Sequence, residues 1–186
     1  MPHERTIQTM NIGQRSSIRN MNEATDPRPG ELGGHVYVRG SDEEYQKIQL
    51  DSGAVAATPT GVVAQGQVAY WKAKGPTYIV TNDHRLDMGA ESTNASAKRN
   101  QVAGVFTNAL TAGNFGVIQV GGNYSTVLTN GDNNGVAGDH VIASTTSSQA
   151  DMVAAGTAPT HVTLGLAAGA EAASRVSVDL DCKRVF

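Results

Sequence analysis

From residue 35 onward the sequence alternates apolar and polar residues with a period of two, and this pattern limits the possible folds more than any other feature. In residues 35–39 (HVYVR), 47–51 (KIQLD) and 175–180 (RVSVDL), apolar Val, Ile or Leu residues recur at every second position. Successive side chains of a β-strand point to opposite faces, so each run places its apolar residues on one face. The alternation therefore predicts strands that are buried on one side.

Further short runs rich in β-branched and aromatic residues are separated by Gly, Asn, Asp or Pro. They are residues 67–71, 77–81, 101–106, 115–120, 125–129, 140–144 and 161–166. The chain has 21 glycines and 17% charged residues, a composition that favours strands and tight turns over helices. Only residues 41–47 and 147–155 have patterns compatible with helical turns. We expect an all-β fold, a compact barrel or sandwich of short, mostly antiparallel strands.

Two stretches of the sequence resemble each other. Residues 102–120 align with residues 163–180 so that Gly104 corresponds to Gly165, and a run that begins with Gly precedes each stretch. After a slip of one residue, the alignment matches two apolar positions near the end of each stretch, Ile118 and Val120 with Val178 and Leu180. The alignment predicts two related β units that share a core. Chance similarity in a sequence rich in Gly, Ala and Val is the alternative.

Residues 1–34 differ from the rest, and we interpret them as an extended N-terminal arm ahead of a β domain at residues 35–186. The arm mixes positive and negative charges and ends in DPRPGELGG at residues 26–34. Prolines and glycines in such a run disfavour regular structure. The arm is either a disordered tail or a segment that becomes ordered on a neighbouring molecule. Its arginines are candidate contacts with a partner: Arg5, Arg15, Arg19 and Arg28.

Charge and hydropathy argue against two classes of partner. The formal net charge is −3 and the isoelectric point is about 5.9, whereas nucleic-acid binding usually needs a clustered basic patch. We therefore expect no nucleic-acid partner. No run approaches the ~18 apolar residues of a membrane helix, so we expect no membrane partner either. The single cysteine, Cys182, cannot form an internal disulfide.

The sequence contains no recognisable catalytic or metal-binding motif. His84 and His140 each follow an aspartate, but neighbours on a strand point to opposite faces, so neither pair forms a catalytic unit. Residues 130–135 (NGDNNG) resemble a calcium loop, but Val141 stands where such a loop needs a bidentate carboxylate. We expect a protein that is not an enzyme and binds no metal or cofactor. Convergence of His84, His140 or His161 with carboxylates in a deep polar pocket would favour an enzyme or a sugar-binding module instead.

Three runs together resemble the head-decoration, or capsid-cement, proteins of tailed bacteriophages. They are residues 66–83 (GQVAYWKAKGPTYIVTND), 101–122 (QVAGVFTNALTAGNFGVIQVGG) and 138–144 (GDHVIAS). In that family a strand that begins G-x-x-V is followed by V-A-G-V, a small-residue turn of the form T-x-G-N-x-G, and a strand similar to I-Q-V-G-G. The resemblance is best over residues 61–143, extends loosely to the carboxyl end, and does not include the arm.

The resemblance implies a structural virion protein, made in the host cytoplasm, that binds the outer surface of an assembled phage capsid. Such a protein stabilises the capsid by clamping neighbouring major capsid proteins, and it also contacts neighbouring copies of itself as a dimer or trimer. Within the motif, the resemblance implies structural roles in turns and core for Gly104, Gly113, Gly116, Ile118 and Val120. Gly113 and Gly116 would permit the tight turn, and the two apolar residues would enter the core.

Exposed aromatic residues and arginines are enriched at protein interfaces, so the candidate contact residues are Tyr37, Arg39, Tyr45 and the arginines of the arm. If the arm docks on a partner, deletion of residues 1–34 should leave a folded barrel with impaired docking. A phage fibre, receptor-binding or adhesin-like protein is the alternative function, because such proteins are also rich in strands, Gly and Asn.

Overall fold

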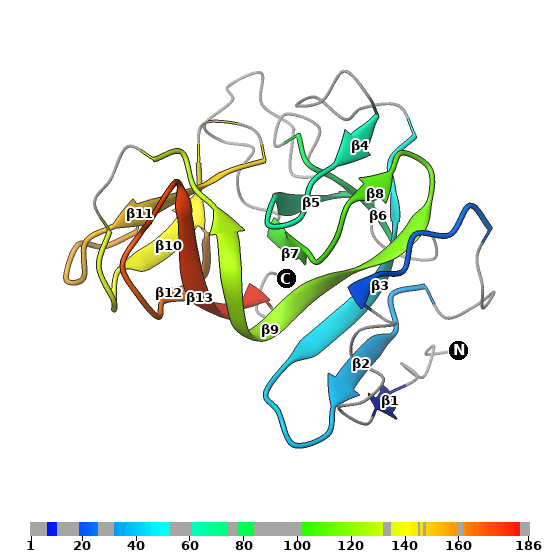
Figure 1. The fold of residues 1–186 in the computed structure, drawn as a ribbon, viewed down its shortest axis with the longest axis horizontal. Helices are drawn as coiled ribbons and strands as arrows, with labels where there is room; N and C mark the ends of the chain where they lie inside the picture. The colour runs from blue at the N-terminus through cyan, green and yellow to red at the C-terminus, as the bar shows by residue number, and fades with distance from the viewer. Residues whose placement is uncertain are drawn as a thin grey trace.

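A computed structural model describes residues 7–10, 19–25, 32–52, 61–73, 78–83, 102–131, 135–144, 146, 148–159 and 162–182. Strands account for every element assigned over these residues (Figure 1). They are β1 (Ile7–Met10), β2 (His35–Val38), β3 (Glu44–Leu50), β4 (Val62–Val63), β5 (Val68–Ala73), β6 (Ile79–Thr81), β7 (Val102–Phe106), β8 (Leu110–Thr111), β9 (Phe115–Leu128), β10 (His140–Ala143), β11 (Ala150–Val153), β12 (Thr163–Ala167) and β13 (Arg175–Asp181).

The expected all-β fold is confirmed, but the two runs with a helical pattern are strands. Residues 44–50 form β3 and residues 150–153 form β11, so the helical interpretation of residues 41–47 and 147–155 is wrong. Both strands are held by pairing with partners elsewhere in the chain, β3 with β2, β6 and β9, and β11 with β10. Tertiary pairing therefore overrides the local pattern at both places.

The first half of the domain is a closed barrel. Its five strands lie in the order β3-β6-β5-β7-β9, and β9 returns to pair with β3. Neighbouring strands are antiparallel except β3 and β6, which run parallel with Gln49 opposite Ile79 and Leu50 opposite Val80. A small separate sheet of β4 and β8 lies beside this barrel, and β2 and β1 extend the main sheet from β3. We call this unit the first barrel.

The second half repeats the same strand order. The end of β9 pairs with β13, and the sheet continues through β12 and β10 to β11, with every pair antiparallel. Thr129, directly after β9, then forms a parallel bridge with Ala150 of β11, at the place where β3 meets β6 in the first barrel. We call this unit the second barrel. Figure 1 shows it at the left, with β9 running into it from the first barrel at the right.

Strand β9 belongs to both barrels. Its 14 residues include Gly121 and Gly122, and the strand continues through them although two glycines commonly end a strand. Before this point β9 pairs with β3 and β7, and after it β9 pairs with β13. Gly122 has φ of +80°, and a β-carbon there would lie 2.7 Å from the carbonyl oxygen of Asp42. The glycine therefore permits both the bend and the close approach of the turn before β3.

The two barrels also share equivalent main-chain hydrogen bonds, which confirms the internal similarity expected from the sequence. The Gly66 amide donates to the Phe106 carbonyl over 2.9 Å, and the Gly138 amide donates to the Ala167 carbonyl over 2.8 Å. The return bonds also correspond, with the Phe106 amide donating to Gln67 over 3.0 Å and the Ala167 amide donating to Asp139 over 2.8 Å.

One side-chain contact is repeated with a different residue type. Gln67 Oε1 accepts the amide of Ala64 over 3.0 Å, and Asp139 Oδ2 accepts the amide of Val136 over 3.0 Å. Asp139 Oδ1 also accepts the amide of Ala155 over 2.9 Å. These backbone hydrogen bonds lower the pKa of Asp139 from its ordinary value, that from Val136 most strongly. An amide and a carboxylate thus secure the same turn in the two barrels.

Each barrel has a glycine at an equivalent point where two strands approach closely. Gly104 in β7 has φ of +156° and Gly165 in β12 has φ of +159°. A β-carbon on Gly104 would lie 2.5 Å from the Gln119 carbonyl oxygen, and one on Gly165 would lie 1.9 Å from the Asp179 carbonyl oxygen. Both residues must therefore be glycine for these strands to pair as they do.

We predict that Gly165→Ala destabilises the protein by about 3 kcal/mol or more, because its methyl group would overlap a main-chain oxygen in a positive-φ conformation. Gly169→Ala is the matched control, since nothing lies within 4 Å of a β-carbon there. Urea unfolding of the two variants measures the difference. Equal midpoints for both would contradict the strand packing described above.

Candidate functional site

The motif residues of the sequence resemblance lie in β7, in β9 and in the turn before β9. Ile118 and Val120 are buried in the main core, as expected. Gly113 has φ of +84° in the turn before β9, so its expected role is confirmed. Gly116 lies within β9 and not in the turn. A β-carbon there would lie 2.8 Å from a Leu110 methyl carbon and 3.1 Å from the Met21 carbonyl oxygen, so the space beside Gly116 is limited by Leu110 and the arm, which corrects the turn role assigned to it.

Residues 19–25 of the arm lie along β9 of their own chain. Glu23 and Phe115 exchange main-chain hydrogen bonds of 3.0 and 2.8 Å. Thr107 Oγ1 donates to the Arg19 carbonyl over 2.9 Å, and Asn108 Nδ2 donates to the Met21 carbonyl over 3.3 Å. In the second barrel Arg175 is the counterpart of Phe115. Arg175 exchanges its main-chain hydrogen bonds with Ala172, which lies in the same hairpin. The arm segment therefore fills a place in the first barrel that the second barrel fills with its own turn.

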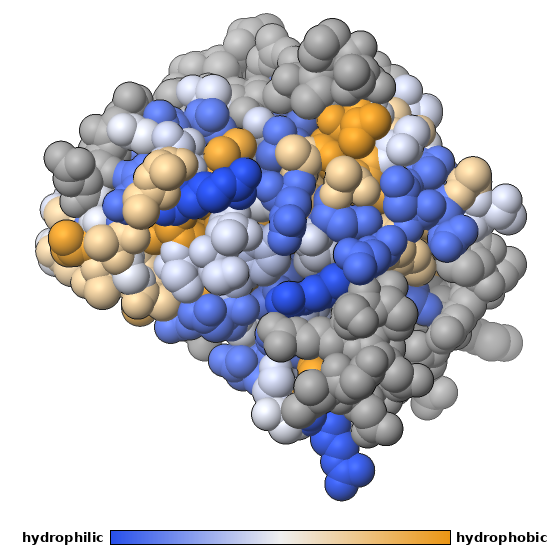
Figure 2. Space-filling model, in the orientation of Figure 1, coloured by the Kyte–Doolittle hydropathy of each residue, from blue (hydrophilic) through white to orange (hydrophobic). Residues whose placement is uncertain are grey.

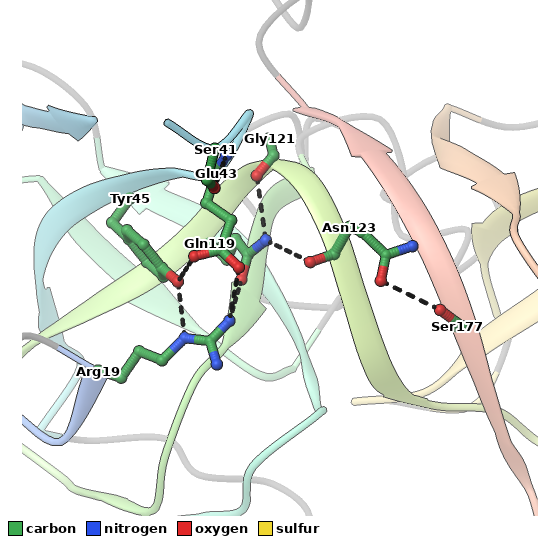
Figure 3. A network of polar contacts seen from close by, with 8 residues as sticks. All are labelled: Arg19, Ser41, Glu43, Tyr45, Gln119, Gly121, Asn123 and Ser177. Atoms are coloured by element: carbon green, nitrogen blue, oxygen red, sulfur yellow. Dashed lines mark hydrogen bonds and ion pairs between the residues drawn. The ribbon is translucent and has the colours of Figure 1, made fainter. Parts of the chain in front are cut away.

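Arg19 anchors this segment through a polar network on the outside of the first barrel (Figure 3). Its Nε donates to the Tyr45 hydroxyl over 2.6 Å, and one terminal nitrogen lies 3.4 Å from Glu43 Oε1 and 3.3 Å from Gln119 Oε1. The Tyr45 hydroxyl donates to Glu43 Oε2 over 2.8 Å. Burial raises the pKa of Tyr45, and the hydrogen bond to Glu43 raises it further. The network is thus a partly buried, charge-assisted contact between the arm and the barrel.

The arm also covers apolar side chains. A small core separate from the main one contains Val36, Val38, Tyr45 and Val117, and Met21 packs against it. Strand β1 pairs in parallel with β2, with Ile7 opposite His35. The described parts of the arm therefore lie on their own domain. Deletion of residues 1–34 would remove Arg19 and Met21 as well as β1, so we expect it to destabilise the first barrel as well as to impair docking.

Some of the candidate contact residues are exposed in the structure and others are buried or bonded within the chain. Tyr37 is 36% exposed, and Arg39 is exposed in the turn after β2. Tyr45 is fully buried, because the arm covers its ring and Arg19 bonds its hydroxyl, so the expectation of an exposed aromatic residue there is wrong. Arg19 bonds to its own barrel. The remaining candidates, Arg5, Arg15 and Arg28, lie outside the described residues.

The outer face of the first barrel has a row of residues that we call the covered row: Val68, Val105, Gln119 and Tyr45. Register pairs each of them with the next across β5, β7, β9 and β3. All four are fully buried. Arg19 bonds to Gln119 and Tyr45 at one end of the row, and at the other end the Val68 amide donates to the Ser148 carbonyl over 2.9 Å.

The second barrel has an equivalent row across β10, β12, β13 and β9, which we call the open row: His140, Leu166, Asp179 and Asn123. Leu166 is 46% exposed, Asp179 and Asn123 are exposed, and His140 is half-buried. Figure 2 shows the surface of the second barrel that faces the viewer, at the left, as a mixture of hydrophilic and hydrophobic residues. Equivalent strands thus carry a covered face in one barrel and a bare face in the other.

The remaining titratable residues do not form a reactive centre in the part of the chain that the structure describes. No group of three or more His, Cys, Asp or Glu side chains there could hold a metal ion. His35 Nδ1 lies 2.5 Å from Glu44 Oε1, between β2 and β3, and His84 and His161 lie outside the described residues. Burial raises the pKa of the Cys182 thiol to about 12, which leaves it protonated and unreactive at neutral pH.

Two further findings complete the description. No helix within the described ranges is long and apolar enough to cross a membrane. The comparisons with protein families, with curated proteins and with solved structures found no match for this chain.

We predict that Arg19→Ala and Tyr45→Phe each destabilise the protein by about 1 to 3 kcal/mol, because each removes hydrogen bonds from a partly buried, charge-assisted network. The double variant should lose less than the sum of the two, with a coupling of about 0.5 kcal/mol or more. Arg39→Ala, at an exposed turn, is the control and should change stability by less than about 0.5 kcal/mol. Strict additivity in chemical denaturation would show that the arm does not hold Arg19 against Tyr45.

Proposed function

We propose that this protein is a structural virion protein that binds the outside of an assembled phage capsid and clamps neighbouring major capsid proteins. The proposal begins from the sequence resemblance to head-decoration proteins. The residues that carry it form β5, β6, β7, the turn around Gly113 and the first half of β9 in the first barrel, and β10 in the second barrel. They are therefore residues of the scaffold, and the proposal needs no catalytic group.

The observation that best supports a clamping role is the pair of barrels joined by β9. A continuous strand with main-chain hydrogen bonds to both barrels holds them at one spacing. A rigid body with two outer faces can contact two neighbouring subunits at once, and the second contact then benefits from a high effective concentration. Two weak contacts are therefore enough for stable attachment.

A protein of this kind stabilises its target without chemistry. Binding that is restricted to the assembled lattice lowers the free energy of that state relative to the precursor and to free subunits. The spacing of the two faces gives the selectivity for the mature shell over its precursor. Subunits that move apart or together when a shell matures change the distance that the two barrels must span. The proposal accordingly places the protein on the outer capsid surface, after synthesis in the host cytoplasm, with no enzymatic role.

The test is co-sedimentation of the purified protein with mature, undecorated heads from a phage that carries this gene, with unexpanded procapsids as the control. We expect saturable binding to mature heads alone, with a higher temperature of head disruption at saturation. Absence of binding to both shells would reject the proposal, and binding to glycans by an elongated trimer would favour a fibre or adhesin.

A further inference from the structure

The open row of the second barrel is equivalent to a row that, in the first barrel, binds an extended segment containing an arginine. Gln119 and Asp179 occupy equivalent positions in the two barrels. In the first barrel Gln119 lies opposite Val105, which directly follows Gly104. In the second barrel Asp179 lies opposite Leu166, which directly follows Gly165. In the first barrel Gln119 Oε1 accepts a hydrogen bond from Arg19. The first barrel therefore shows which kind of segment fits this face.

The open row has chemistry that suits such a segment better than the covered row does. Asp179 offers a carboxylate where Gln119 offers a neutral amide, and a guanidinium forms shorter and stronger hydrogen bonds with a carboxylate. Arg175 is the only Lys or Arg between residues 102 and 182, a stretch with six Asp and Glu residues. Leu166, 46% exposed, provides apolar surface beside the acid. The face is thus acidic with an apolar neighbour.

The two rows are physically continuous (Figure 3). Gln119 Nε2 donates to the Asn123 carbonyl over 3.0 Å, and Asn123 Nδ2 donates to Asp179 Oδ1 over 2.8 Å. Ser177 Oγ lies 3.3 Å from Asn123 Oδ1. The Arg19 network of the covered row therefore extends through Asn123 to the carboxylate of the open row. Asp179 is held in place by Asn123 before any partner arrives, which reduces the entropy lost on binding.

We propose that the open row is a docking face for an extended protein segment that carries an arginine next to apolar residues. Arg19 makes the equivalent contact with Gln119 in the first barrel, where Met21 packs against the small core that contains Tyr45. The guanidinium of the docked segment pairs with Asp179 and Asn123, and its apolar residues cover Leu166. The proposed function enters at one point: it identifies the protein that supplies this segment as a capsid subunit. The chemistry of the segment follows from the equivalence of the two barrels.

The probe is a labelled peptide with the sequence of residues 17–25, SIRNMNEAT, titrated against the full-length protein by fluorescence anisotropy. In the covered row the chain's own Arg19 already bonds Gln119, and Asp179 is the exposed equivalent of Gln119 in the open row. Ala172 fills the place of Glu23 in the second barrel, so the arginine of the peptide and not its glutamate carries the expected contact. We expect saturable binding that weakens about tenfold with Asp179→Asn and with a peptide carrying Arg19→Gln, since one charge-assisted contact is lost. Asp151→Asn, on β11 outside the row, is the charge-matched control and should bind as the wild type does.

Absence of peptide binding, or equal affinity for the Asp179→Asn and wild-type proteins, would overturn the inference. Thermal unfolding of each variant confirms that the fold is intact. Co-sedimentation of the same variants with mature heads separates this inference from the proposed function. Head binding that does not depend on Asp179 rejects the docking face alone, whereas Asp179-dependent peptide binding without head binding rejects the capsid as partner.

Discussion

Main-chain hydrogen bonding along β9 is the constraint on which the rest of this structure depends. One half of the strand closes the first barrel against β3 and β7, and the other half pairs with β13 in the second barrel. The strand passes between them at Gly121 and Gly122, where the turn before β3 leaves no room for a side chain on Gly122. Because both barrels depend on the same strand, a change at this point would alter the angle between two faces and not only one local turn.

The arm makes the two barrels differ. Both have the same strand order, equivalent glycines at close strand contacts and equivalent hydrogen bonds at the turn before β5 and β10. Arg19 and Met21 then cover the Tyr45 and Gln119 end of the outer row in one barrel, and Val68 and Val105 at the other end belong to the main core. In the equivalent row of the other barrel, Leu166, Asp179 and Asn123 are exposed. Among the residues that the structure describes, the exposed row of the second barrel therefore corresponds to a row that is buried in the first. The proposal of an arginine-bearing segment rests on this asymmetry, and the capsid proposal rests on the sequence resemblance and on the two barrels joined by β9.

Sequence reasoning recovered the features that depend on local pattern. The alternation of apolar residues in 35–39 and 175–180 predicted β2 and β13, and the alignment of Gly104 with Gly165 predicted the two units. It failed where distant partners decide the outcome. The double glycine signalled the end of a strand, but pairing with β13 carries β9 through it. Tyr45 was expected to be an exposed contact residue because aromatic residues are enriched at interfaces, yet an arm residue 26 positions away covers it. The covering residue, Arg19, was identified only as a contact for some other molecule.

A cryo-electron microscopy reconstruction of mature heads saturated with this protein tests the central claim most directly, which is that β9 holds two barrels as one body that joins two capsid subunits. The account predicts two-lobed density at each site, with the barrels at the spacing found in the free protein and each lobe over a different capsid subunit. Density in which one barrel alone contacts the shell, or in which both barrels rest on the same subunit, would contradict it.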